Sequence, residues 1–134
     1  MKHLIKGCAL VLGLCFGLVA ETGLVSAQSQ ACAGLGKDIS EMKADLNDYK
    51  KYKELHTADK FDLEETISEI RKDLNEYISH PKSGPDEISK AKQGIELLSE
   101  MQDGINKEDL KRIVSGYAKL IEVYEWFYVY EGCK

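Results

Sequence analysis

Long hydrophobic runs are missing from this chain of 134 residues, which argues against a membrane-spanning helix. The longest apolar run, residues 7–20, is well short of the roughly 20 residues that such a helix needs. Lys2 and Lys6 precede it, and Val25-Ser26-Ala27 follows with small residues. This pattern is typical of a secretory signal peptide. We expect cleavage after Ala27, with a weaker alternative after Ala20, and a periplasmic or secreted protein without a stable membrane anchor.

Cysteine is scarce, and its placement is informative. Of four cysteines, two lie within the predicted signal peptide, so Cys32 and Cys133 remain in the exported chain. In an oxidising compartment an isolated pair of this kind usually forms one disulfide. The alternative is a lipoprotein in which one cysteine is acylated. The residues before Cys15 and Cys32 fit that signal poorly, so we predict a Cys32–Cys133 disulfide.

Positive charge is in the minority. The sequence holds 18 basic and 23 acidic residues, and removal of Lys2, Lys6 and Glu21 with the signal leaves 16 and 22, a net charge of −6. So acidic a chain repels phosphate groups, which argues against nucleic acid and anionic lipid as partners. The densest basic group, Lys50, Lys51 and Lys53, is interleaved with acids and indicates a solvated helix face.

Recognisable catalytic and metal-binding patterns are also lacking. After the signal, only His56 and His80 remain, and in the fold predicted below they lie at opposite ends of a helix about 30 Å long. Met101 could approach His56 as a haem ligand, but a methionine at helical spacing is usually part of a core. Paired acids fall in predicted first turns of helices, where the helix dipole explains them. We expect no catalytic residues, no metal and no cofactor, and therefore no enzyme.

Strand-like alternation is almost absent, whereas apolar residues recur at helical spacing. The first two stripes are Leu35, Ile39, Met42, Leu46 and Tyr49, and then Leu63, Ile67, Ile70, Leu74 and Tyr77. Polar residues between them predict a turn near 56–61, with Asp62 capping the second helix. The two stripes are in phase across the gap, so one long helix over residues 35–79 stays an alternative.

Two further helices follow clearer breaks. His80-Pro81 ends the second helix, because a residue before proline avoids the helical conformation. Residues 83–87 open the third helix with Pro85 in its first turn, and Gly104 is expected to end it. Asn106 is then expected to cap the fourth helix, which should end near Gly132.

The prediction is therefore all-α: a small antiparallel up-down-up-down four-helix bundle closed by a terminal disulfide and preceded by a cleaved signal peptide. Residues 1–27 form the signal and residues 28–134 a single helical domain. An even number of alternating helices brings both chain ends to one end of the bundle, where Cys32 and Cys133 can meet. One long helix would keep the two cysteines too far apart to bond within one chain.

Aromatic residues are concentrated in the last helix. Tyr124, Trp126, Phe127, Tyr128 and Tyr130 occupy five of seven positions and must point in several directions. Tyr124 and either Phe127 or Tyr128 can face the core, whereas Trp126 and Tyr130 point elsewhere. The predicted binding residues are Trp126, Tyr130 and Tyr128, because exposed tyrosine and tryptophan are enriched at protein interfaces.

The function we predict is that of an exported, non-enzymatic protein-binding bundle, of inhibitor, immunity, chaperone or adaptor type, with a protein partner of unknown identity. The alternatives are that the aromatic residues only fill the core, or that the bundle carries a small apolar ligand or haem. Surplus aromatic residues could also support a homodimer.

Overall fold

The computed structural model describes residues 24–133, and all structural statements refer to them. They form four helices: α2 (Leu24–Lys50), α3 (Thr57–Ser79), α4 (Pro85–Asn106) and α5 (Leu110–Tyr130). Within this range no residue lies in a strand, so the all-α prediction is confirmed. Residues 35–79 form two helices rather than one. Most of the predicted signal peptide, residues 1–23, lies outside the described residues.

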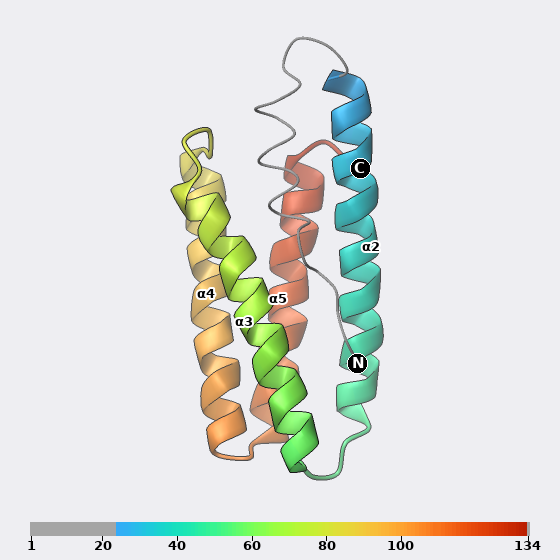
Figure 1. Ribbon diagram of the computed structural model, residues 1–134, viewed down its shortest axis with the longest axis vertical. Coiled ribbons are helices and arrows are strands. Elements are labelled where there is room, and N and C mark those ends of the chain that lie inside the picture. Colours follow the sequence, from blue (N-terminus) through green and yellow to red (C-terminus); the bar gives the residue numbers. More distant parts are fainter. Residues whose placement is uncertain (1–23, 134) are drawn as a thin grey trace.

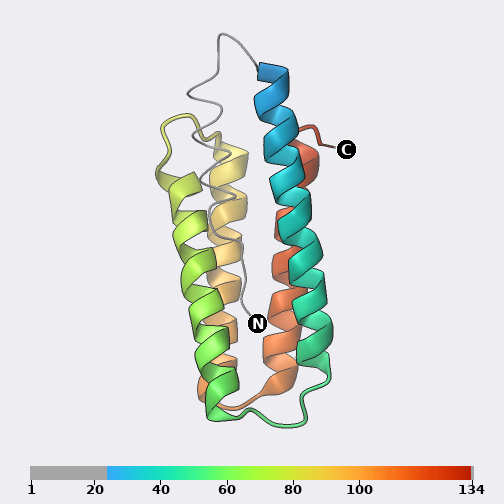
Figure 2. The same cartoon turned by 45° about the vertical axis from the view of Figure 1, so that its right-hand side comes forward.

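The helices lie side by side as a bundle (Figure 1). The α2–α3 and α4–α5 connections are at its lower end in that view, and the α3–α4 connection is at the upper end. Close backbone approaches join α4 to α5, α3 to α4, and α2 to α5. No Cα atom of α2 comes within 8 Å of one in α3, and Figure 2 shows these two helices apart. None of the described helices is long and apolar enough to cross a membrane.

The start of α3 corrects the sequence prediction. The turn occupies residues 51–56, not 56–61, and Asp62 lies inside the helix. The reason is an earlier cap: the backbone N–H of His56 donates to the carboxylate of Asp59 at 3.0 Å. Leu55, just before this cap, is buried and closes the lower end of the core. The acid at the third helical position that marks the start is therefore Asp59, which precedes the predicted cap, Asp62, by three residues.

The α4–α5 turn is also shifted from the predicted position. Asn106 is the last residue of α4, and Asp109 is the cap of α5, accepting from the backbone N–H of Arg112 at 3.1 Å. Gly104 does not end α4. A Cβ atom there would lie 2.9 Å from Cγ1 of Ile113, so this glycine permits close packing of α4 on α5.

The core follows the apolar stripes read from the sequence. The stripe residues of α2 and α3 are buried except Leu46, which is partly buried against the core. From α5, Tyr117 packs against Tyr49 with ring centroids 5.3 Å apart, and Phe127 stacks on Tyr77 at 4.4 Å. Aromatic rings thus link α5 to both α2 and α3, which compensates for the separation of those two helices.

The end of α5 places Cys133 for its bond. Gly132 adopts a left-handed conformation, with φ 79°, and its N–H donates to the carbonyl of Val129 at 2.9 Å. The N–H of Cys133 then donates to the carbonyl of Tyr128 at 3.0 Å. This pair of bonds is a Schellman motif, which reverses the chain direction. Cys133 comes to disulfide distance of Cys32, with Cα atoms 5.4 Å apart.

Candidate binding site

Trp126 and Tyr130 form a stacked aromatic pair on the last two turns of α5. They are four residues apart, which places them on one helix face. Their ring centroids are 4.6 Å apart with an angle of 21° between the planes. Trp126 is half-buried against the core, whereas 46% of Tyr130 is exposed. The pair therefore offers a rigid apolar surface with a polar hydroxyl at its edge.

This pair faces α4. The ammonium of Lys90 lies 5.6 Å from the ring centroid of Trp126, within cation–π range. The hydroxyl of Tyr130 comes to 3.5 Å from where a Cβ atom on Gly84 would lie. The last turn of α5 therefore lies against the start of α4.

Carboxylates gather around the exposed ring. Glu87, Asp86 and Glu131 raise the pKa of Tyr130 through their negative charge, with Glu87 the strongest. Glu87 is held in place because its carboxylate accepts from the backbone N–H of Gly84 at 2.9 Å. Burial, together with a hydrogen bond and repulsion from Glu87, raises the pKa of Glu131 to about 7. The aromatic pair thus lies in a negative environment, with Lys90 as its nearby positive group.

Tyr128 lies apart from this pair, on the side of α5 that faces α2. Its ring is 3.5 Å from where a Cβ atom on Gly36 would lie. It lines a shallow groove of about 670 Å³ between the two helices, together with Val129, Cys133 and residues of α2. Lys43 and Glu125 form an ion pair of 2.8 Å beside it. The three predicted binding residues are therefore divided between two faces, with Trp126 and Tyr130 on one and Tyr128 on the other.

The other aromatic residues of α5 belong to the core. Tyr117, Tyr124 and Phe127 are almost completely buried. Phe127, not Tyr128, occupies the inner position that the sequence left open between the two. Phe61, the most exposed large apolar residue described, lies near the start of α3 at the opposite end of the bundle.

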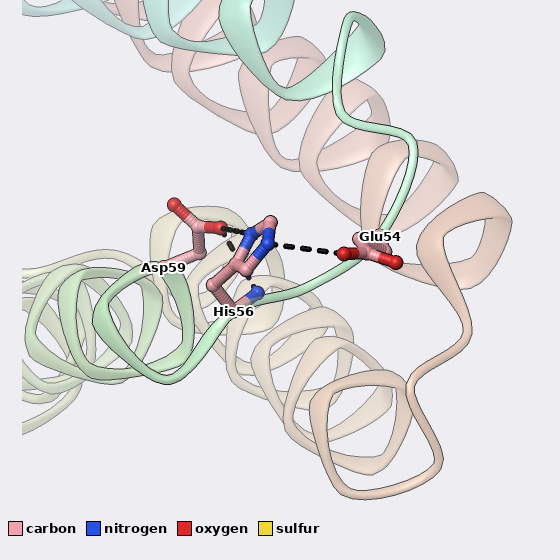
Figure 3. A network of polar contacts seen from close by, with 3 residues as sticks. All are labelled: Glu54, His56 and Asp59. Atoms are coloured by element: carbon pink, nitrogen blue, oxygen red, sulfur yellow. Dashed lines mark hydrogen bonds and ion pairs between the residues drawn. The ribbon is translucent and has the colours of Figure 1, made fainter.

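The two histidines stand at opposite ends of α3, His56 directly before it and His80 directly after it. His56, shown in Figure 3, contacts the carboxylates of Asp59 at 3.3 Å and Glu54 at 3.0 Å, and it is exposed. His80 follows α3, where its Nδ1 accepts from the backbone N–H of Lys82 at 3.1 Å. Met101 is fully buried in the core. Across residues 24–133, no group of three or more potential ligands is placed to hold a metal.

Comparison of the chain with known protein families, with characterised proteins and with solved structures found no match.

Proposed function

We propose that this is an exported binding protein rather than an enzyme, and that it recognises a protein partner through Trp126 and Tyr130. The observation that carries the proposal is the stacked, partly exposed pair of rings. Exposed tyrosine and tryptophan on a rigid helix bind with little loss of side-chain entropy. The bundle itself is proposed to be of the up-down-up-down type, a rigid support for such a surface.

The charges around the pair suggest the chemistry of the partner. Asp86, Glu87 and Glu131 lie close enough to Tyr130 for their negative charges to raise its pKa. We propose that the partner brings a lysine or arginine side chain to these carboxylates while an apolar group contacts the rings. Such complementarity accelerates association and makes it sensitive to salt. Capture of the partner should therefore weaken as ionic strength increases.

Substitution of the aromatic pair tests the proposal. We expect Trp126→Ala and Tyr130→Ala each to weaken partner capture by about 30-fold or more, as typical hot-spot residues do. Loss of stability should be small for Tyr130→Ala, since its side chain is exposed, and about 1–2 kcal/mol for the half-buried Trp126. Melting temperature and pull-down from the native compartment measure the two effects.

Two matched controls make the result specific. Phe61→Ala removes an exposed aromatic ring at the far end of the bundle and should leave capture unchanged. Tyr124→Ala removes a buried ring and should cost roughly 3–5 kcal/mol. Unfolding by all three α5 substitutions would contradict the proposal.

A bound chromophore or ligand, seen in the absorbance spectrum or native mass of the purified protein, would favour the carrier alternative.

Export is proposed on the signal pattern, and the cysteine pair at disulfide distance supports it. We expect the exported chain to begin at Gln28, four residues before Cys32. Cleavage there would remove the first turn of α2, which begins at Leu24. N-terminal sequencing of the exported protein measures this directly, and an uncleaved chain or an acylated cysteine at the start would contradict it.

A further inference from the structure

The interface between α2 and α3 differs from the other helix interfaces of the bundle. The two backbones stay more than 8 Å apart at their Cα atoms, whereas the other sequential pairs and the α2–α5 pair approach closely. The buried polar residues of the described chain are Asp38 of α2 and Thr66 and Asp73 of α3. All of them therefore belong to the two helices that border this wide interface.

Asp73 is poorly accommodated at this interface. Only 2% of the residue is exposed, and its Oδ2 atom has no hydrogen-bond partner. A buried carboxylate without full hydrogen bonding is costly in the ionised form. The charges that act on it most are those of Asp38 across the interface and of Glu69, Lys72 and Glu76 on its own helix. Burial and then repulsion from Asp38 raise the pKa of Asp73 to about 7.

Asp45, closer to the lower end of the bundle, is a second partly buried acid of α2, and its neighbour outside α2 is Tyr117 of α5. Asp45 is half-buried and interacts with the buried hydroxyl of Tyr117. The negative charges of Asp48 and Glu41 lie nearby and also act on it. Burial is the main reason that its pKa rises to about 6. The inner side of α2 thus carries acidic groups that are more compatible with packing when they hold a proton.

We propose that α2 is a pH-dependent arm, which packs against α3 while Asp73 is protonated and separates from it when Asp73 ionises. A protonated Asp73 has no charge to repel Asp38, so both side chains can stay buried between the two helices. Two ionised carboxylates shielded from water repel each other and require hydration. The Cys32–Cys133 pair ties the upper part of α2 to α5, so opening should begin at the Lys50 end. This behaviour does not depend on which partner the protein binds.

Amide hydrogen exchange of the intact oxidised protein tests the proposal. After correction for the intrinsic exchange rate, protection of amides in the Lys50 half of α2 should fall roughly 10- to 100-fold from about pH 5 to about pH 8. Amides in the centre of α5 should lose much less, because α5 also packs on α4. Asp73→Asn, which cannot ionise, should remove most of the pH dependence of α2.

Glu65→Gln is the matched control, because it makes the same change of charge at an exposed position of α3. It should leave the pH dependence of α2 as in the wild type. Equal loss of protection in all helices would overturn the proposal, because the effect would then be global unfolding. Unchanged pH dependence in Asp73→Asn would also overturn it. If Asp73→Asn fails to fold, Asp38→Asn provides the same test from the other side of the interface.

Discussion

Replacement of both Cys32 and Cys133 with serine is expected to lower the free energy of unfolding by roughly 4–5 kcal/mol. The two residues are 101 positions apart, so their bond restricts almost the whole described chain in the unfolded state. Loss of that restriction favours unfolding even where every other contact is kept. Denaturant titration of the oxidised wild type and the double serine variant measures the difference.

Intact mass completes this test. The oxidised protein should weigh less than its reduced form by two hydrogen atoms, with no free thiol. Reduced wild-type protein should unfold like the double variant, which controls for effects of the serine side chains. Two free thiols in the exported protein, or a disulfide-linked dimer as the main species, would show that the intramolecular bond does not form.

The second large effect expected is a loss of stability as the pH rises from about 4 to about 7. Because the pKa of Asp73 is about 7 when folded and 3.8 ordinarily, the folded protein keeps a proton that the unfolded chain releases. The resulting stabilisation is complete below about pH 4 and is lost as the pH rises through about 7. The difference between the two pKa values sets an upper limit of roughly 4 kcal/mol.

Other carboxyl groups also titrate in this range, so the comparison with Asp73→Asn isolates the contribution of this residue. We expect the stability of the variant relative to the wild type to increase with pH up to about 7 and then to remain constant. Urea unfolding at a series of pH values measures this. A difference that does not change with pH would contradict the raised pKa of Asp73.

Helical periodicity predicted most of the fold, because each helix buries a stripe of apolar residues and the stripes are easy to recognise. The helix starts were harder. Asp59 caps the N–H of His56, and Asp109 caps α5, yet Asp62 and Asn106 match a capping pattern equally well in sequence. The sequence alone does not distinguish Asp59 from Asp62 at the start of α3; in the structure Leu55, just before His56, is buried in the core.

The candidate site was only partly predictable. Helical spacing showed that the aromatic run of α5 could not all face inward, but it did not show that Trp126 and Tyr130 stack on each other. Asp86 and Glu87 were attributed to the dipole of α4. The sequence could not reveal that the last turn of α5 brings Tyr130 beside them, since that contact depends on how two distant segments pack.

The buried acids were missed although a signal was present. Asp38 follows Leu35 by three residues, and Asp73 follows Ile70 by three, so both flank an apolar stripe at equivalent positions. An acid beside a stripe usually points to solvent. Here the separation of α2 from α3 leaves room for both side chains inside the bundle, and no local pattern encodes that separation.

The same separation bears on the order in which the bundle forms. α3 packs on α4, and α4 packs on α5, the next helix in the chain in each case. α2 approaches only α5, the helix most distant from it in sequence. Contacts between neighbours form quickly, while those that close a long loop form late. The first of these helices to be synthesised is therefore expected to be the last to dock, after α5 is complete. The apolar stripe of α2 stays uncovered until then, which makes α2 the segment of the nascent chain most open to chaperones.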